Sequence, residues 1–217
     1  MSCDQLSSLL KVAFYLQILL TGLIAVKGRV EWGDFRNPKE IRSLMEKHKI
    51  IPDIHTLFTF YEVEATFKNG KKADMGNELS KEDTQDPPTV TYNWDEGSYY
   101  TLLMTDLDAP SPEIPNLREW QHWLVVNIPH DNVTAGETLS EYIGPGTQNF
   151  TGKHRYVITC YRQPGDRPLK FDETHLDAKS DYGRIMFSTN HFATDYDYGD
   201  PLAVQFWYTP HDHKKWY

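Results

Sequence analysis

Three short apolar segments place the strongest constraint on what this chain can fold into. They span residues 99–106, 122–128 and 155–161, and each is apolar at nearly every position rather than at alternate ones. Such runs are typical of β-strands covered on both faces, because a solvated face would place polar side chains at every second residue. The chain is therefore expected to build its core around a covered sheet.

Weaker signals add strands around these segments. Residues 59–67 alternate between apolar and polar side chains, and residues 89–94 and 202–208 also have the composition of strands. The dipeptide Asn69-Gly70 tolerates the positive φ of a tight hairpin turn. The pattern predicts a mainly β fold, an antiparallel sheet or β-sandwich-like domain with a few peripheral helices.

Two helices are expected. Asn37 can cap the first, Glu40 completes a capping box, and Pro52 ends it. Residues 181–192 are expected to form the second, with Ile185, Met186 and Phe192 facing inward. Neither segment carries a chemical signature, so both are interpreted as structural.

Composition limits the class of protein. The 217 residues are 39% hydrophobic and 13% aromatic, which is enough for one domain with a core. The formal net charge is -9 and Lys and Arg form no stripe, so the chain is not expected to bind nucleic acid.

The N-terminus has the form of a secretory signal peptide. Lys11 precedes an apolar run from Val12 to Val26, and small residues near Gly28 permit cleavage there. An uncleaved membrane anchor is the alternative, although the run is shorter than the ~20 residues of a membrane span. We expect residues 1–28 to be the signal peptide of a secreted protein, and residues 29–217 to form a single domain.

Two features bear on export. Asn132 and Asn149 each begin an Asn-X-Thr sequon, so both are candidate glycosylation sites on a secreted glycoprotein. Cys160 is the single cysteine after residue 28 and lies in an apolar strand, so we expect a buried thiol and no intrachain disulfide in the mature chain.

Polar residues at strand edges are the candidates for function. Asp106 ends one apolar segment, while His122 and His154 lie near the starts of the next two. One carboxylate and two imidazoles could hold an anion, bind a metal ion or perform acid–base catalysis. Strict alternation places Trp120 and His122 on one face of their strand and Trp123 on the other.

Neighbouring residues add to this cluster. Asp108 is expected to be the ordinary turn residue of the Asp106–Asp108 pair, with its carboxylate bonded to following backbone N–H groups. The glycines at 144, 146 and 152 would let the backbone approach a ligand and present N–H groups to it. No activated serine or catalytic cysteine signature is visible, so we expect a binding protein and not an enzyme.

Four ordered motifs give a resemblance. D-L-D-A-P-S-P, R-E-W-Q-H-W-L-V-V-N-I-P, Y-I-G-P-G and G-K-H-R-Y-V together resemble the phosphatidylethanolamine-binding protein (PEBP) family. The resemblance extends to D-M-G-N-E-L and Y-R-Q-P-G and covers essentially all of the chain after residue 28. It implies a large central sheet with a smaller sheet packed on it, and cis peptide bonds at Ala109-Pro110 and Arg118-Glu119.

The same resemblance implies a small anion pocket. It would take phosphatidylethanolamine or another phosphate-bearing small ligand, without a cofactor or a metal ion, in a monomer that could also contact a membrane peripherally. The alternative is a secreted protease inhibitor or signalling modulator that acts through a protein partner. Departures at Leu107 and at Thr147-Gln148 alter the pocket rim. The matching ligand-binding positions are Asp106, Pro110, Trp120, His122, Gly146, His154 and Tyr156.

The expected mechanism depends on charged histidine. Asp106 would favour the imidazolium form of a neighbouring histidine and so raise its pKa. Both imidazoles, the Gly146 N–H and the Tyr156 hydroxyl would then donate hydrogen bonds to phosphate oxygens. We therefore expect anion binding to weaken as the pH rises through the range in which histidine titrates.

Overall fold

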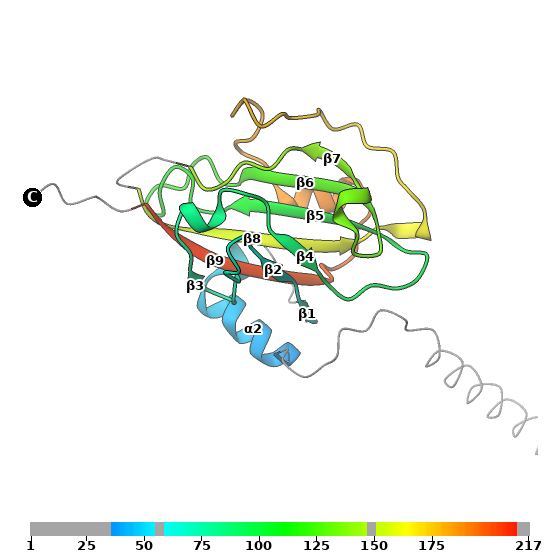
Figure 1. Cartoon of the computed structure of the whole chain (residues 1–217), viewed down its shortest axis with the longest axis horizontal. Helices are drawn as coiled ribbons and strands as arrows, with labels where there is room; N and C mark the ends of the chain where they lie inside the picture. The colour runs from blue at the N-terminus through cyan, green and yellow to red at the C-terminus, as the bar shows by residue number, and fades with distance from the viewer. Residues whose placement is uncertain (1–35, 55–58, 147–150, 212–217) are drawn as a thin grey trace, which may run out of the picture.

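The computed structural model describes residues 36–54, 59–146 and 151–211, and these form a mainly β domain (Figure 1). The predicted signal peptide, the Asn149 sequon and the Thr147-Gln148 departure lie outside the described residues. The three apolar segments are strands β5 (Tyr99–Asp106), β6 (Trp120–Pro129) and β8 (Gly152–Arg162). Strand β5 matches its predicted segment, whereas β6 and β8 extend beyond theirs at both ends.

A seven-stranded sheet forms the centre of the domain. Its order is β1-β9-β8-β5-β6-β7, with β3 paired to β9, so β8 and β5 lie in the middle. The pairs among β9, β8, β5, β6 and β7 are antiparallel, whereas β1 and β3 run parallel to β9. The large sheet is therefore mixed. The remaining strands are β1 (Tyr61–Glu62), β3 (Asn77–Glu78), β7 (Glu137–Ser140) and β9 (Ala203–His211).

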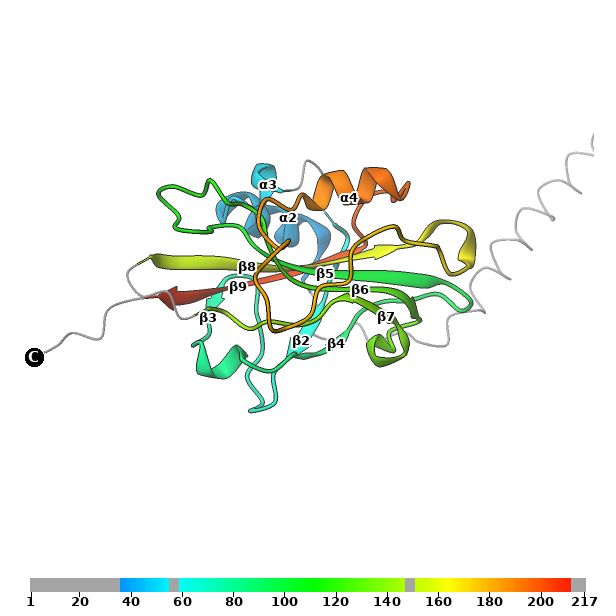
Figure 2. The ribbon, with the colours of Figure 1, turned by 90° about the horizontal axis from the view of Figure 1, so that it is seen from above.

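A small antiparallel sheet of β2 (Glu64–Thr66) and β4 (Thr89–Thr91) covers one face of the large sheet (Figure 2). Residues 59–67 were expected to form one strand, but the chain passes from β1 in the large sheet to β2 in the small one. The predicted burial of alternate residues holds, because Val63, Ala65 and Phe67 are all in the core between the sheets. The Asn69-Gly70 turn is also present, with Gly70 at φ 80°.

Helices cover the opposite face (Figure 2). Helix α2 (Pro38–Lys47) has the predicted Asn37–Glu40 capping box and packs Ile41 and Met45 against the sheet. The short helix α3 (Ile50–Asp53) follows it, and α4 (Thr189–Asp195) covers the other end of the same face through Phe192. Three 3-10 turns complete the elements: η1 (Glu82–Thr84), η2 (Val133–Ala135) and η3 (Pro164–Asp166).

The expected helix at 181–192 is wrong for most of its length. Residues 181–188 form turns, and the helix begins only at Thr189 after the N-cap Ser188. Phe192 is buried as predicted, but Ile185 and Met186 are 45% and 70% exposed. Gly183 and Met186 have positive φ values of 81° and 58°, which a right-handed helix does not accommodate.

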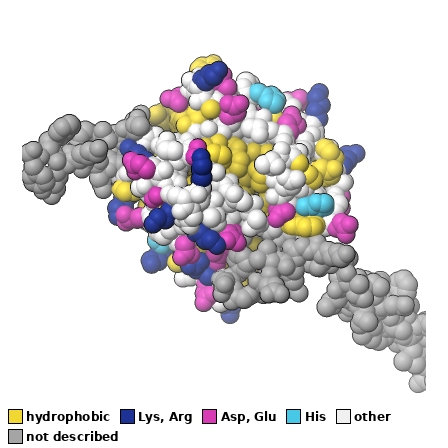
Figure 3. Space-filling model, viewed as in Figure 1, with side chains coloured by type: hydrophobic (Ala, Val, Ile, Leu, Met, Phe, Trp, Pro, Cys, Tyr) yellow, Lys and Arg dark blue, Asp and Glu magenta, His cyan; other side chains and the backbone are white. Residues whose placement is uncertain are grey.

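Charged side chains of both signs share the face of the domain viewed in Figure 3. On the face viewed in Figure 3, Asp and Glu side chains are interspersed with Lys and Arg, without a continuous basic area among the described residues. Within the described part of the chain, none of the helices has the length and apolar character needed to cross a membrane. Cys160 is buried in β8, as predicted.

Candidate functional site

Three adjacent strands bring the predicted site residues together at one end of the large sheet. Asp106, the last residue of β5, is paired with Tyr156 of β8 on one side and with Trp120 of β6 on the other. A cavity of about 590 Å³ opens beside them. Its lining contains all seven positions singled out from the sequence: Asp106, Pro110, Trp120, His122, Gly146, His154 and Tyr156.

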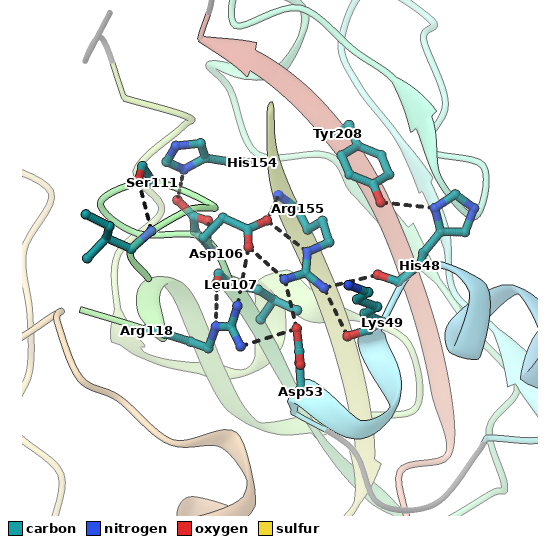
Figure 4. A network of polar contacts seen from close by, with 12 residues as sticks. His48, Lys49, Asp53, Asp106, Leu107, Ser111, Arg118, His154, Arg155 and Tyr208 are labelled. Carbon is teal, nitrogen blue, oxygen red and sulfur yellow. Dashed lines mark hydrogen bonds and ion pairs between the residues drawn. The ribbon is translucent and has the colours of Figure 1, made fainter. Parts of the chain in front are cut away.

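Asp106 and His154 form the polar centre of this cavity. The His154 Nδ1 atom lies 2.7 Å from Asp106 Oδ2, and both side chains are buried (Figure 4). The other Asp106 oxygen accepts a hydrogen bond from the Asp108 N–H at 2.7 Å, which fixes the carboxylate. His154 Nε2 lies 3.0 Å from the Thr151 hydroxyl. The carboxylate therefore orients the imidazole, whose second nitrogen faces the Thr151 hydroxyl, and His154 lines the cavity.

A register shift in β6 changes the predicted arrangement around His122. Met104 pairs with Trp123 and Thr105 pairs with Gln121, so His122 is an extra residue in the ladder. Because of this irregularity, Trp123 packs into the same core as Tyr156 and Met104, on the face that carries Asp106. The expectation that Trp123 faces away from Trp120 and His122 is therefore wrong, because strict alternation does not hold across a bulge.

His122 is not the second phosphate-binding cation expected from the sequence. Burial lowers its pKa, a hydrogen bond to the Ile143 carbonyl acts in the opposite direction, and the positive charge of Arg184 adds to the lowering, so that the pKa is about 3. The Nδ1–H donates to that carbonyl at 2.6 Å, and the Ile143 N–H donates back to the His122 carbonyl at 3.0 Å. His122 is thus a neutral imidazole at physiological pH, and its Nε2 atom is an acceptor.

Aromatic rings hold His122 in place. Its ring centroid lies 4.2 Å from that of Trp120 and 5.0 Å from that of Tyr156. Tyr156 in turn stacks on Trp207 of β9, with centroids 5.7 Å apart. Burial raises the pKa of the Tyr156 hydroxyl well above its usual value, and the charge of Asp106 adds to this effect. The hydroxyl therefore stays protonated and can donate a hydrogen bond.

Arg184 was not among the predicted site residues. Its side chain is fully buried behind Trp120, with Cζ 5.5 Å from the centroid of the Trp120 ring. Its guanidinium donates to neutral acceptors, namely the backbone carbonyls of Gln121, His122, Glu141, Asp177 and Ser180 and the hydroxyl of Ser140.

The charge of Arg184 is only distantly balanced. No carboxylate of the described residues lies within 4.0 Å of it, and the charges of Asp181, Asp177 and Glu141 act on it from the surface. A buried cation without a paired carboxylate favours an anion nearby. The G-R pair at 183–184 within a polar loop gave no signal from which this role could be predicted.

Asp108 has a different role from the one expected. Its carboxylate accepts hydrogen bonds from the Arg155 backbone N–H at 2.9 Å and from the Arg155 guanidinium at 2.7 and 2.8 Å. The turn hydrogen bond is made instead by Asp106, to the Asp108 N–H. The predicted roles of Asp106 and Asp108 were wrong. The Asp108 carboxylate binds the buried guanidinium of Arg155 on strand β8, and the sequence alone does not show that these two residues are neighbours.

The glycines also divide between roles. A side chain at Gly144 would meet the backbone of Thr84 and Gln85 at 2.8 Å, so this glycine permits close packing of η1. Gly146 is exposed and lines the cavity, and an added Cβ would have no atom of the described residues within 4 Å. Of the two, only Gly146 has the open space that a ligand could use. Both cis peptide bonds implied by the resemblance, Ala109-Pro110 and Arg118-Glu119, are present.

Two alternatives for the cluster can be compared with the geometry. Among the described residues, no group of three His, Cys, Asp or Glu side chains is arranged to hold a metal ion. A catalytic role would need an activated hydroxyl, and Ser111 is the first hydroxyl residue after Asp106 in the sequence. Its oxygen accepts a hydrogen bond from the Ile114 N–H at 3.2 Å. The arrangement provides hydrogen-bond donors, an acceptor and a buried cation around a cavity, which is the chemistry of a binding site.

Comparison with known proteins establishes the family. Residues 65–195 match the family model described as phosphatidylethanolamine-binding protein, so the chain belongs to this family. It is also 32% identical to the putative odorant-binding protein A5 of Drosophila melanogaster over 167 residues, which are 77% of this chain and 79% of that protein. The resemblance seen in the motifs is thereby confirmed at the level of the family.

Solved structures show the same fold. The carboxypeptidase Y inhibitor, in its complex with the cognate proteinase, matches with a TM-score of 0.67 and 23% identity over 79% of this chain and 95% of the inhibitor. The phosphatidylethanolamine-binding protein from Plasmodium vivax matches with a TM-score of 0.61 and 21% identity over 82% of this chain and 98% of that one. The predicted fold class, a large sheet with a small sheet and a few helices, is confirmed.

Proposed function

We propose that this protein is a secreted, monomeric binding protein whose cavity takes the phosphate group of a small ligand, such as the headgroup of phosphatidylethanolamine. The observation that carries the proposal is the asymmetry of charge around the cavity. Arg184 lies buried behind Trp120 without a carboxylate within 4.0 Å among the described residues, and His154, oriented by Asp106, lines the cavity. An anion in the cavity would balance this charge.

The lining side chains suit a phosphate ester. A ring N–H of His154 can donate to one phosphate oxygen, and the Tyr156 hydroxyl can donate to another. The exposed Gly146 also lines the cavity. His122 acts differently, because its Nε2 can accept a hydrogen bond from the ammonium group of an ethanolamine headgroup or from a protonated phosphate oxygen.

Relatives and sequence signals support the ligand-binding and extracellular parts of the proposal. A relative at 32% identity is named as a putative odorant-binding protein, which supports the ligand-binding part of the proposal. The apolar run at residues 12–26 has the form of a signal peptide, and Asn132 is exposed in a turn where its sequon is accessible. The alternative is a secreted protease inhibitor or signalling modulator, in which a protein partner and not the cavity determines the activity.

Calorimetric titration with O-phosphoethanolamine, inorganic phosphate and ethanolamine tests the function. We expect the first two to bind and ethanolamine alone to bind much more weakly, because the phosphate is the group that the buried charge attracts. His154→Gln should lower the affinity for phosphoethanolamine about 10- to 100-fold, the value of one hydrogen bond to a charged group. His175→Gln is the matched control, because His175 is exposed on the loop after β8.

Two results would overturn the proposal. One is the absence of binding by any phosphate-bearing ligand to protein whose thermal unfolding is cooperative. The other is an affinity that is equal in wild type and in His154→Gln. In either case the inhibitor or modulator alternative would become the better account of this fold.

A further inference from the structure

Exposed apolar side chains are concentrated beside the cavity. The described residues include five large hydrophobic side chains that are exposed, and four of them lie on the two loops that build one side of the cavity mouth. These loops are residues 107–119, between β5 and β6, and residues 177–187, before α4. We call the four side chains the apolar rim: Ile114 (64% exposed), Tyr182 (88%), Ile185 (45%) and Met186 (70%).

The two loops form one continuous surface. The Met186 N–H donates to the Leu117 carbonyl at 3.2 Å, and Glu119 and Phe187 exchange two backbone hydrogen bonds of 3.0 Å. Leu117 and Ile185 both line the cavity, so the rim borders the opening directly. A ligand that enters the cavity on this side therefore passes apolar side chains first.

Backbone conformation holds part of the rim outward. Met186 has a φ of 58°, the left-handed region, which costs a long side chain of the L configuration ~1 kcal/mol or more. Its side chain is 70% exposed, so burial within the described part of the domain does not offset this cost. Such conformations persist where the surrounding structure holds them, and here the hydrogen bond from the Met186 N–H to the Leu117 carbonyl does so.

The charges near the rim exclude several partners. Glu113, Asp177 and Asp181 are exposed on these loops, whereas Lys179 is the single exposed basic residue among positions 107–119 and 177–187. Arg118 is paired with Asp53 and Asp108, and Arg184 is buried. An anionic membrane or a nucleic acid would be repelled by this surface.

We propose that the apolar rim inserts among the headgroups of a phospholipid bilayer without net charge, so that the cavity receives a headgroup while the lipid is still in the membrane. This inference rests on the proposed function, because it assigns the source of the phosphate. A bilayer presents both chemistries found here, an apolar layer and a phosphate, at one boundary. Tyr182 is of the residue type that favours such an interface.

Lipid transfer and vesicle flotation with the full chain test the inference. The rim variant Ile114→Ser/Tyr182→Ser/Met186→Ser, which leaves the cavity-lining Ile185 in place, is compared with Phe60→Ser, because Phe60 is the fifth exposed large hydrophobic of the described residues and lies outside both loops. All proteins keep the same N-terminus, so its apolar run contributes equally. Donor vesicles contain phosphatidylcholine and fluorescent phosphatidylethanolamine, and both lipid transfer to the protein and co-flotation are measured at low and high salt.

We expect the rim variant to lose at least about tenfold in transfer and in co-flotation, while its affinity for soluble phosphoethanolamine stays within about twofold of wild type. Phe60→Ser should behave as wild type, and salt should have little effect because the rim is not basic. Unchanged co-flotation of the rim variant, or an equal loss in Phe60→Ser, would overturn the inference and favour a protein partner for this surface. A different result would separate the two proposals. If the rim variant loses co-flotation but wild type does not bind soluble phosphoethanolamine, the membrane role of the rim stands and the proposed function is overturned.

Discussion

Two charged clusters lie back to back at the same end of the sheet, and they differ in how completely their charges are paired. Asp106 and His154 line the cavity, whereas Arg155 points toward Asp53 and the end of α2 (Figure 4). Asp108 belongs to the second cluster, because its carboxylate binds the Arg155 guanidinium. His154 and Arg155 are successive residues of β8 and therefore point to opposite faces. Asp108 reaches the helix side because it lies in the bend after β5, which ends at Asp106.

The helix-side cluster is saturated. Arg155 pairs with Asp108 at 2.7 Å and with Asp53 at 2.9 Å, and it also donates to the His48 and Lys49 carbonyls at the end of α2. Arg118 adds ion pairs to Asp53 at 3.2 Å and to Asp108 at 3.4 Å. Although burial opposes it, pairing with Asp108 and Asp53 raises the pKa of Arg155 above its usual value. This cluster joins the helix-side layer to the loop after β5.

The cavity-side cluster contains one charge without a close partner among the described side chains. Asp106 Oδ2 lies 2.7 Å from His154 Nδ1 and His154 Nε2 lies 3.0 Å from the Thr151 hydroxyl, whereas the nearby Arg184 donates only to neutral acceptors. The difference teaches how to separate a structural charge cluster from a binding one in this fold. In the first cluster each charged group is paired with an opposite charge, whereas the second has a buried cation, Arg184, without a carboxylate within 4.0 Å among the described residues and close to a cavity wall.

The largest expected effect tests the structural half of this comparison. Arg155→Met leaves Asp108, which is 2% exposed, with a buried charge that Arg118 alone must balance. We expect a loss of about 3–5 kcal/mol in the free energy of unfolding, measured by urea denaturation. Arg42→Met removes the exposed Arg42–Glu46 pair on α2 and should cost less than about 1 kcal/mol. Similar losses in both variants would show that the helix-side cluster is not a structural clamp.

The neutral state of His122 gives a second, smaller effect with a defined pH window. Its pKa is about 3 in the folded protein and near 6.5 when unfolded, so between these values the unfolded chain binds more protons. Stability should therefore fall as the pH falls from 6.5 toward 3, with a contribution of up to about 1.4 kcal/mol per pH unit from this histidine.

The readout is the slope and not the absolute stability. His122→Gln removes the titrating group, so its unfolding free energy should depend less steeply on pH than that of wild type in this window. Carboxylates that titrate in the same range are common to both proteins and cancel in the difference. Equal slopes would mean that His122 is not held neutral, and the two-imidazolium arrangement expected from the sequence would then be restored.

The sequence predicted the parts of the site that depend on local order along the chain. The continuous apolar runs located β5, β6 and β8, and the motifs next to them contain all seven predicted lining residues. Sequence could not place what depends on contacts between distant segments. The extra residue at His122 arises from pairing with β5, and Arg184 lies behind Trp120 only because the loop before α4 folds back on β6.

The failed helix at 181–192 has the same origin. Its apolar residues have helical spacing, but Met186 and Phe187 are held by backbone hydrogen bonds to Leu117 and Glu119. These bonds to another loop replace the bonds that a helix would make within itself. Helical spacing predicted that Ile185 and Met186 face inward. Because the helix does not form there, both side chains are exposed beside the cavity mouth and belong to the apolar rim.

The smallest expected effect sharpens the cavity half of the comparison at a single atom. Tyr156→Phe removes one hydroxyl from the cavity lining and keeps the ring that stacks on Trp207 and contacts His122. Loss of one neutral hydrogen bond should lower the affinity for phosphoethanolamine about 2- to 10-fold, with unfolding changed by no more than about 1.5 kcal/mol. Tyr161→Phe is the control on the same strand, because Tyr161 is buried on the helix side.

The pH dependence of this effect tests the state of the hydroxyl. Since burial keeps the Tyr156 hydroxyl protonated, the ratio of wild-type to Tyr156→Phe affinity should be the same at pH 6 and at pH 9. A ratio of one at both pH values would remove this hydroxyl from the binding site, whereas a ratio that changes with pH would mean that another titrating group controls it.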